Sequence, residues 1–420
     1  MLTRRSLLAG AALLPSLAHA ARHDPPLGST SPRSPFAGPT GDDDFWRTIQ
    51  EEFTLDRSMI NLNNGGCSPT PRVVHEAFKR TLDQANQAPA YQLWQLLEPG
   101  VETVRRELAR EAGCDPEELA ITRNASEALQ CAQLGLTLQA GDEVILTDQD
   151  YPRMQDTWDQ RALRDGIVIK RVSFPVPLTD PAVIVETYRA AITPRTRVLH
   201  MSHVVFLTGQ VLPIQALCTL ARERALVSIV DGAHAFAHVP VNLHDIGCDY
   251  YGTSLHKWLL APVGTGFLYV RRERIADHWP LTPANVARKA DIRKFEEIGT
   301  HPAANHNAIA EALVFHRRIG PARKHARLHA LRMRWSDALR THPKVKLWTP
   351  DDPAVSGAIG LFSVAGMEPA ALVGPLWDKY RIIATPINHA QFAGVRVTPN
   401  VYTTPEEIDT FVGAVQSIVA

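Results

Sequence analysis

The chain has 420 residues, of which 45% are hydrophobic and 21% are charged, and its 44 acidic residues balance its 44 lysines and arginines. A formal charge of zero gives no argument for a protein that binds nucleic acid or an anionic membrane surface. The five cysteines are scattered and form no CxxC pair, so the sequence indicates neither a disulfide framework nor a zinc knuckle. The length exceeds what one hydrophobic core usually serves, and we therefore expect a large domain and a smaller one.

The first twenty residues, MLTRRSLLAGAALLPSLAHA, have the pattern of an export signal. Arg4 and Arg5 precede an apolar run at 7–17 that is too short to span a bilayer, and an A-x-A cleavage pattern follows at 18–20. The paired arginines favour a twin-arginine signal over an ordinary secretory signal, which is the alternative. We therefore expect the twin-arginine export machinery as a partner and a periplasmic mature protein without a membrane span.

Residues 21–41 are rich in Pro, Ser and Gly, which is typical of a linker. Folded structure is expected to begin near Asp42. We expect an N-terminal segment and a large domain over 42–300, followed by a small C-terminal domain over 301–420.

Apolar, β-branched runs alternate with segments of helical length up to about residue 270. Strands are predicted at 58–63, at the start of 118–136, and at 143–151, 166–174, 196–204, 225–234, 248–254 and 266–270. Helices are predicted at 70–86, at 100–113 and in the second half of 118–136. This alternation predicts an α/β fold with a mainly parallel sheet covered on both faces. Such sheets bind ligands beyond the carboxyl ends of their strands.

The pattern changes after residue 300 and indicates a small α+β domain. Helices are predicted near 305–319, 321–341 and 368–379 and from Thr404 to the C-terminus, and strands at 358–364, 381–385 and 394–399. The last helix opens with a Thr-Pro-Glu-Glu capping pattern.

Three predicted strand ends carry residues that could take part in chemistry. In TRNASEALQ (122–130), Asn124 and Ser126 lie where a strand passes into a helix, so backbone N–H groups and hydroxyls there could hold a phosphate. The alternative is an ordinary helix cap.

The second strand end is IVDGAHAFAHVPV (229–241), in which Asp231 directly follows an apolar run. A carboxylate at a buried strand end needs a cation, a protonated ring or a set of N–H donors. Asp231, His234 and His238 also have ligand-like spacing, which leaves a metal site as an alternative.

The third strand end places Ser254, His256 and Lys257 together before an apolar strand. A buried lysine has a lowered pKa and becomes a nucleophile able to form a Schiff base, whereas the alternative is a surface lysine. Together, the lysine, the acid Asp231 and the upstream helix start match a pyridoxal 5'-phosphate site.

These motifs show that the chain resembles the class V aminotransferases, a subgroup of the fold-type I pyridoxal phosphate enzymes, and most of all their isopenicillin N epimerase-like branch. The resemblance covers roughly residues 58–418, and its most specific block is VDGAHAFAHVPVNLHDIGCDYYGTSLHKWLLAPVGTGFLYVRRE. By this resemblance, Lys257 forms the Schiff base and Asp231 pairs with the ring nitrogen. His234 is expected beside the phenolic oxygen of the ring, and Tyr151 is expected to stack on the ring.

The resemblance also implies a set of phosphate contacts and a second subunit. Contacts with the phosphate are expected from Ser254, His256, Ser126 and the Ala125 backbone. The Gly-Thr pair that ends in Thr300 is expected to reach the phosphate of a neighbouring subunit, which implies a homodimer with shared sites.

Two further residues are expected to bind substrate by the same resemblance. Arg396, in GVRVTP, matches the arginine that binds the α-carboxylate, and a bidentate fork suits a carboxylate better than lysine would. Asn64, in NLNNGGCSP, is expected to touch substrate from the loop over the site.

The chain departs from the family pattern at two places. Where the family often has SNxTG, this chain reads VFLTG, so Phe206 replaces an asparagine that bonds the ring. No cysteine follows Cys248, although cysteine desulfurases need one on a loop of the C-terminal domain. We therefore do not expect a cysteine desulfurase.

The sequence and the resemblance together predict an enzyme that acts on the amino group of an amino acid or a peptide-derived metabolite. Epimerisation and transamination are the expected reactions. The alternatives are a lyase, including one that cleaves C–S bonds, a decarboxylase, and a non-catalytic binding protein that kept the fold. The export signal is similar to that of exported enzymes of this fold that tailor pyoverdine-type siderophores.

Overall fold

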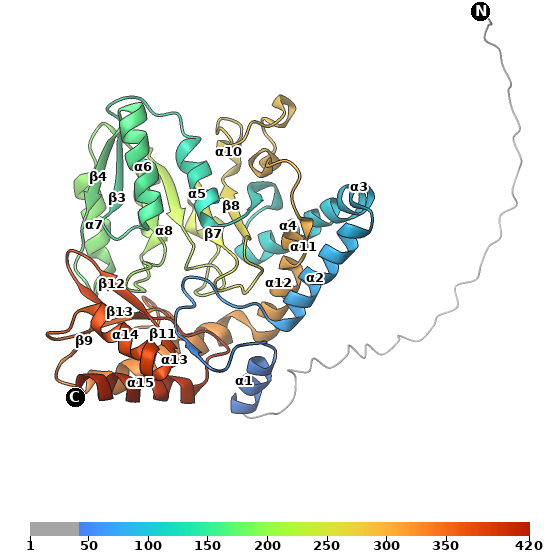
Figure 1. Cartoon of the computed structure of the whole chain (residues 1–420). Helices are drawn as coiled ribbons and strands as arrows, with labels where there is room; N and C mark the ends of the chain where they lie inside the picture. The colour runs from blue at the N-terminus through green and yellow to red at the C-terminus, as the bar shows by residue number, and fades with distance from the viewer. Residues whose placement is uncertain (1–41) are drawn as a thin grey trace, which may run out of the picture. The chain divides into compact units, whose positions relative to one another are not determined.

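The computed structural model describes residues 42–420, so the predicted export signal (1–20) and the predicted linker (21–41) lie outside the described residues. The first described helix begins at Asp42, and helices then alternate with strands (Figure 1). The strands are β1 Ile60–Asn61, β2 Leu119–Thr122, β3 Glu143–Thr147, β4 Val168–Val172, β5 Thr196–Ser202, β6 Val227–Asp231, β7 Tyr250–Ser254, β8 Gly266–Val270, β9 Val345–Leu347, β10 Gly360–Val364, β11 Ile382–Ile383, β12 Thr385–Asn388 and β13 Ala393–Val397.

The helices include four short 3-10 or π segments, labelled η. They are α1 Asp42–Glu51, α2 Arg72–Gln87, α3 Pro89–Tyr91, η1 Gln92–Leu97, α4 Glu98–Ala112, η2 Pro116–Glu118, α5 Ala125–Leu134, α6 Pro152–Asp165, α7 Pro181–Ala191, α8 Ile214–Glu223, α9 Leu243–Ile246, α10 Arg272–Ile275, η3 Val286–Arg288, η4 Ile292–Glu296, α11 Ala303–Asn307, α12 Ile309–Ile319, α13 Pro321–Arg340, α14 Pro369–Tyr380 and α15 Pro405–Val419.

The main sheet has seven strands in the order β2-β8-β7-β6-β5-β3-β4. The five strands from β7 to β4 run parallel, and β8 runs antiparallel to both of its neighbours. The predicted mainly parallel sheet is therefore confirmed. The register pairs Ser202 with Asp231 and Asp231 with Gly252, so the carboxyl ends of β5, β6 and β7 lie at one edge.

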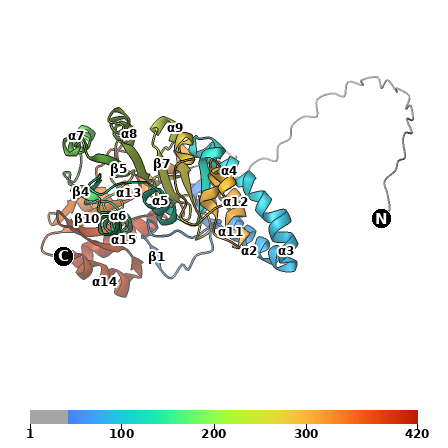
Figure 2. The ribbon, with the colours of Figure 1, turned by 90° about the horizontal axis from the view of Figure 1, so that it is seen from above.

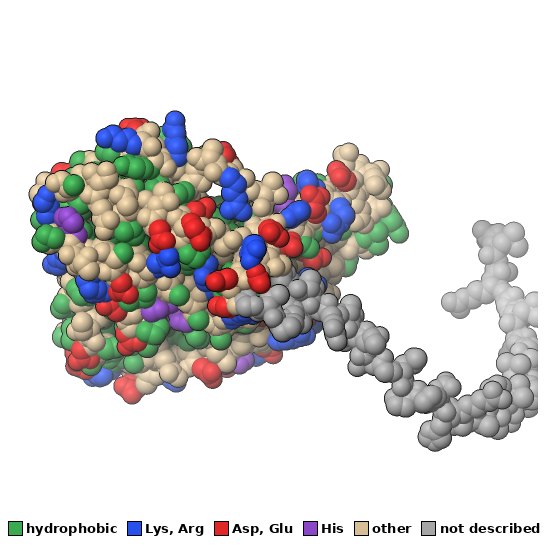
Figure 3. All heavy atoms as spheres, turned by 90° about the horizontal axis from the view of Figure 1, so that it is seen from below, with side chains coloured by type: hydrophobic (Ala, Val, Ile, Leu, Met, Phe, Trp, Pro, Cys, Tyr) green, Lys and Arg blue, Asp and Glu red, His purple; other side chains and the backbone are tan. Residues whose placement is uncertain are grey.

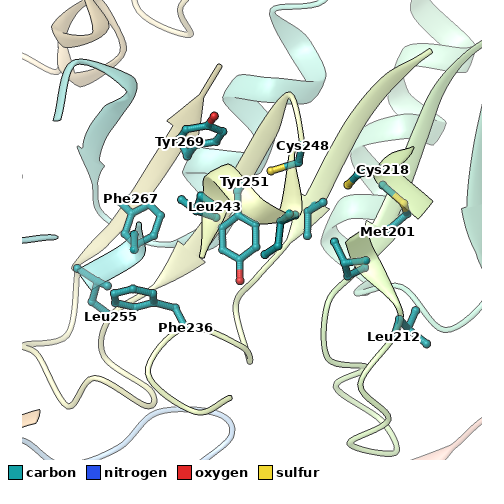
Figure 4. Packing of buried hydrophobic residues seen from close by; sticks show 14 of the residues in the cluster. Met201, Leu212, Cys218, Phe236, Leu243, Cys248, Tyr251, Leu255, Phe267 and Tyr269 are labelled. Atoms are coloured by element: carbon teal, nitrogen blue, oxygen red, sulfur yellow. The ribbon is translucent and has the colours of Figure 1, made fainter. Parts of the chain in front are cut away.

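Helices cover both faces of this sheet, because neighbouring residues of a strand point to opposite sides. On one face, Val198 and Ile229 pack in a cluster with residues of α5 and α6. On the other, Leu199 and Val230 pack in a cluster with residues of α7 and α8, part of which is shown in Figure 4. Figure 2 shows α7 and α8 on the side of the strands opposite α5 and α6.

The C-terminal region forms a separate antiparallel sheet in the order β12-β13-β10-β9, against which α13, α14 and α15 pack. Its core holds Trp335, Phe362 and Phe411, with ring centroids 5.6 to 6.1 Å apart. The capping box of Thr404 starts α15, as predicted. The single strand predicted at 381–385 is wrong in detail: the chain forms β11 there and then β12 through Asn388, an edge strand that carries Pro386.

The described surface carries acidic and basic side chains interspersed, as the face in Figure 3 shows. Within residues 42–420, no helix has the length and apolar character that a bilayer crossing requires. Exposed apolar side chains gather on α2, α3 and η1, namely Leu82, Tyr91, Trp94 and Leu96.

A buried arginine joins the edge of the main sheet to the segment that precedes Thr300. Arg105, on α4, is 1% exposed, and its guanidinium donates to the Leu119 carbonyl at 2.8 Å and to both carboxylate oxygens of Glu296. Glu296 also accepts the backbone N–H of Ile121, on the edge strand β2. The ion pair therefore stabilises the sheet edge as well as η4.

We expect Arg105→Leu to lower the free energy of unfolding by about 3–5 kcal/mol, because it leaves the Glu296 carboxylate without its charged partner in a largely buried position. Urea denaturation measures the loss. Arg110→Leu on the same helix is the matched control, since Arg110 is 70% exposed and paired with Glu107. That change should cost less than about 1 kcal/mol, and an equal loss for both variants would contradict the assignment.

Candidate active site

A cavity of about 470 Å³ lies at the carboxyl ends of β5, β6 and β7. Its wall combines residues of the main sheet with residues of the C-terminal sheet and of the loop after β1. The lining residues are Gly65, Gly66, Asn124, Ala125, Ser126, Leu129, Tyr151, Met154, Ser202, Val204, Phe206, Asp231, Ala233, His234, Ser254, His256, Lys257, Val263, Gly264, Thr385, Ile387 and Arg396. Of the site residues predicted from the sequence, all but Asn64 and Thr300 line it.

Lys257 lies in the wall of this cavity, in the turn that follows β7, and is partly buried. Its Nζ is 3.2 Å from Nε2 of His234. Burial lowers the pKa of Lys257 to about 8, although the carboxylate of Asp231 counteracts that shift. At neutral pH the amine is therefore far closer to its neutral, nucleophilic form than an ordinary lysine is.

Asp231 ends β6 and is 5% exposed. Its Oδ1 accepts the backbone N–H of Ala233 at 2.9 Å, and no ion pair reaches it from residues 42–420. Burial raises the pKa of Asp231, while the charge of Lys257 lowers it. A carboxylate in this position gains most from a cation placed against it inside the cavity.

His234 presents an unused polar atom to its surroundings. Its Nδ1 is buried and has no hydrogen-bond partner among the described atoms. Burial holds the pKa of His234 well below its usual value, so the ring is neutral. A neutral ring that accepts the Lys257 amine at Nε2 carries its proton on Nδ1, which leaves a buried donor free for a ligand.

The start of α5 forms a second side of the cavity. Asn124 caps the helix by accepting the N–H of Glu127 at 2.9 Å, so the capping interpretation holds for this residue. The N–H of Ala125 donates to Oγ of Ser254 at 2.9 Å, which ties the helix start to the end of β7. A Cβ at Gly266 would lie 2.7 Å from Cα of Asn124, so only glycine permits this approach. Helix N–H groups beside two hydroxyls suit an anion such as phosphate.

Tyr151 and Phe206 form an aromatic part of the wall. Tyr151 stands at the start of α6, and its ring meets the ring of Phe206 edge to face, with centroids 5.3 Å apart and an interplanar angle of 88°. The residue that departs from the family pattern therefore supports the ring expected to stack on the cofactor.

Arg396, on β13, brings a fixed positive charge to the cavity. It is 7% exposed, donates from Nη1 to the Phe206 carbonyl at 2.9 Å and from Nη2 to Oδ1 of Asn63 at 3.0 Å, and keeps Nε without a partner. Burial lowers its pKa to about 10. The described part of the chain offers no carboxylate in an ion pair with Arg396, so an anionic ligand would complete its bonding.

Two predicted residues lie outside the cavity wall. The amide of Asn64 is fully engaged: Nδ2 donates to the carbonyls of Asn61 and Thr398, and Oδ1 accepts from the hydroxyl of Tyr402. Thr300 is exposed and is not among the lining residues. A contact of Asn64 with substrate and a contact of Thr300 with a neighbouring subunit both stay predictions.

Sequence reasoning missed three polar residues in or beside the site. Ser202 ends β5 and could have been found by the strand-end argument that identified Asp231. Asn63 accepts a hydrogen bond from Arg396, whereas the sequence pattern pointed to its neighbour Asn64. Thr385 has a buried hydroxyl without a partner in the described structure, and only the pairing of β12 with β13, which sets it opposite Arg396, brings it to the cavity.

The alternative of a metal site fails at His238. Its Nδ1 bonds the carbonyl of His234 at 2.7 Å, and its Nε2 accepts the N–H of Ala358 at 2.7 Å. Its ring also stacks on Trp258, the residue after Lys257, at 3.9 Å. Over residues 42–420, no group of histidine, cysteine and acidic side chains is arranged to hold a metal ion.

Comparison with known proteins identifies proteins that are similar to this chain in sequence and in fold. The chain is 33% identical to isopenicillin N epimerase of Streptomyces clavuligerus over 399 residues, which cover 89% of this chain and 98% of the relative. It is 34% identical to isopenicillin N epimerase of Amycolatopsis lactamdurans, with the same coverage. Among solved structures, a cysteine desulfurase of Thermococcus onnurineus superposes with a TM-score of 0.78 at 22% identity, covering 89% of this chain and 98% of that one.

The superposition shows the fold-type I architecture that the sequence predicted. The family model for class V aminotransferases matches residues 60–411, a span that holds all three sheets of the described structure and every lining residue of the cavity. The chain belongs to the class V aminotransferase family.

Proposed function

We propose that this protein is a pyridoxal phosphate-dependent enzyme that acts on the amino group of an amino acid or a peptide-derived metabolite, by epimerase or transaminase chemistry. One observation carries the proposal: a lysine with a depressed pKa, a buried carboxylate and a buried arginine without an ion-pair partner among the described residues face the same cavity. Each of these groups lacks a charged partner that a cofactor or an amino acid would supply.

Pyridoxal 5'-phosphate is the cofactor of the class V aminotransferases, and the residues present fit it. Asp231 offers an unpaired carboxylate for the ring nitrogen, and the neutral ring of His234 offers a free Nδ1 donor. The start of α5, with Ser126, Ser254 and His256, would hold the phosphate. Tyr151 would cover the ring.

The bound cofactor supplies an electron sink that stabilises negative charge on the carbon next to the substrate amino group. The chain supplies orientation and proton transfer. Arg396 binds the carboxylate of the substrate through its planar fork, and Phe206 and Asn63 keep that fork in place. Lys257 takes the proton from the α-carbon as a general base, and its proximity to His234 keeps the amine directed into the cavity.

Epimerisation is the branch best supported by the relatives. Two isopenicillin N epimerases match this chain over nearly their whole length at 33% and 34% identity. Epimerisation would require delivery of a proton to the face of the α-carbon opposite Lys257, so it needs a second proton donor on that face, whereas the bound cofactor would supply transaminase chemistry by accepting the amino group. C–S or other lyase chemistry, decarboxylation and a non-catalytic binding role are the alternatives.

Cysteine desulfuration is the rival function that the likeness to solved cysteine desulfurases raises. The sequence argument against it stands on the absence of any cysteine after Cys248. Cys67 is the exposed thiol that remains close enough for the charge of Lys257 to affect its pKa, so desulfuration here would have to use Cys67. Partial desolvation of its thiol raises the pKa of Cys67, which lowers the fraction of reactive thiolate at neutral pH.

A homodimer and export through the twin-arginine route complete the proposal. Exposed Thr300 and its neighbour Gly299 are free to meet a second copy, as the family resemblance implies. The arginine pair of the predicted signal supports a periplasmic location for the mature protein.

We expect the purified protein to take up pyridoxal phosphate and to develop an absorption band at about 420 nm, the signature of a cofactor bound to lysine. Lys257→Ala should abolish the band. Lys324→Met is the control, because Lys324 is also buried but bonds the carbonyl of Trp258 outside the cavity. A protein that stays colourless with added cofactor would exclude the proposed function.

The rate of cofactor uptake should depend on pH in a way set by Lys257. Only the neutral amine reacts, so the rate should rise about tenfold per pH unit below pH 8 and level off above it. The charge of Asp231 raises the pKa of Lys257, so Asp231→Asn should lower that pKa. The pH at which the uptake rate levels off should therefore be lower in this variant. With an ordinary lysine, the uptake rate would level off only at about pH 10, and that result would contradict the assignment.

Arg396→Ala should raise KM by about 30-fold or more, because a charge-assisted pair with the carboxylate is lost. The assay is exchange of the α-proton with deuterium oxide, followed by NMR for amino acids of both hands. Arg274→Ala, which removes an arginine paired with Asp249 away from the cavity, is the control and should leave KM within about twofold.

The same assay separates the proposed reaction from desulfuration. Release of sulfide from cysteine at a rate that matches α-proton exchange, and that is lost in Cys67→Ala, would favour a desulfurase over the proposed epimerase or transaminase chemistry.

A further inference from the structure

Asp150 is a buried acid beside the cavity for which the proposed mechanism has no use. It is 1% exposed and lies between β3 and α6. Its Oδ2 accepts the backbone N–H of Thr147 at 2.7 Å and the hydroxyl of the same residue at 3.0 Å. Its Oδ1 accepts the hydroxyl of Ser202 at 2.6 Å. Hydrogen-bond donors therefore surround a carboxylate that has no ion-pair partner within residues 42–420.

These bonds connect two sides of the cavity. Asp150 directly precedes Tyr151, whose ring lines the wall. Ser202 ends β5, lines the same wall and is in register with Asp231 on the neighbouring strand β6. The bond from Ser202 to Asp150 thus ties the turn that carries Tyr151 to the strand beside Asp231.

The carboxylates of Asp150 and Asp231 also interact through their charges. Burial raises the pKa of Asp150 to about 6, and the charge of Asp150 contributes to the raised pKa of Asp231. The other titratable groups around the pair are His200, Tyr188, Lys257 and Tyr251, whose pKa burial raises well above its usual value. Of these, His200 and Tyr188 are neutral, because burial lowers the pKa of the histidine and raises that of the tyrosine. A cation held at Asp231 is therefore stabilised by two buried acids.

We infer that Asp150 and Ser202 are positioning residues for the cofactor ring. They fix the turn that carries Tyr151 relative to the strand end that carries Asp231, the two residues expected to contact the ring, and Asp150 would add a second negative charge to the surroundings of the ring nitrogen. The inference rests on the proposed cofactor site. It concerns cofactor binding and the protonation of the bound cofactor, so its test does not depend on which reaction the enzyme catalyses.

A purely structural role for Asp150 would consist of closing the turn at Thr147. Thr147→Val removes the hydroxyl bond to Asp150 but leaves Ser202 in place. Asp249→Asn is the second control: Asp249 is also buried and accepts the N–H and hydroxyl of Ser228, near the end of β6 opposite to Asp231. Both variants disturb a buried acid while leaving the bond between Asp150 and Ser202 intact.

The experiment measures the Kd of the cofactor-free protein for pyridoxal phosphate, the pH midpoint of the bound-cofactor absorption band, and the thermal midpoint without cofactor. Asp150→Asn and Ser202→Ala should each raise the Kd about fivefold or more. Asparagine keeps an oxygen that can accept the hydroxyl of Ser202, so Asp150→Asn removes the charge whereas Ser202→Ala removes the bond. The double variant should therefore bind at least as weakly as the weaker-binding single variant. Asp150→Asn should also move the absorption midpoint to lower pH, because loss of a negative charge lowers the pKa of a nearby cation.

Thr147→Val and Asp249→Asn should leave the Kd within about twofold of the original, even where they lower the thermal midpoint. The inference is overturned if Asp150→Asn and Ser202→Ala bind the cofactor like the original protein, or if the controls weaken binding equally. Failure of the original protein to bind any cofactor would instead remove the proposed function, and this inference with it.

Discussion

The amine of Lys257 lies in the wall of the cavity, where protein largely encloses it, and the organisation of the site follows from that position. Loss of water lowers its pKa to about 8, and the carboxylate of Asp231 limits the fall. Nε2 of His234 lies 3.2 Å from the amine, and burial keeps the pKa of His234 well below its usual value, so the ring remains neutral. Because these three residues come from the end of β6, the loop after it and the turn after β7, the parallel arrangement of the two strands is what allows them to meet.

The C-terminal sheet supplies a second positive group to the cavity, the guanidinium of Arg396. Arg396 reaches the cavity from β13 and is held by the Phe206 carbonyl and by Asn63. The loop after β1 is fixed in turn by bonds between Asn64 and the Thr398 carbonyl. The charge that would bind a carboxylate therefore depends on contacts between segments more than 300 positions apart in the sequence.

The sequence was sufficient for the parts of the site that depend on strand ends. Asp231, Lys257 and Ser254 follow apolar runs that form buried strands, so periodicity alone locates them. Contacts across the two sheets could not be read in this way. Thr385 reaches the cavity through the pairing of β12 with β13, and β12 is a short edge strand with a proline that carries no clear strand signal. The engagement of the Asn64 amide by Tyr402 likewise requires the folded chain.

The two buried lysines provide the most direct test of the account. Lys324 has a pKa lowered to about 7 by burial, but it bonds the Trp258 carbonyl and lies outside the cavity wall. The measurement is borohydride reduction of the protein with bound pyridoxal phosphate, followed by peptide mapping with mass spectrometry. The account predicts a single reduced adduct on Lys257. An adduct on Lys324, or labels spread over surface lysines with Lys257 unmodified, would contradict it.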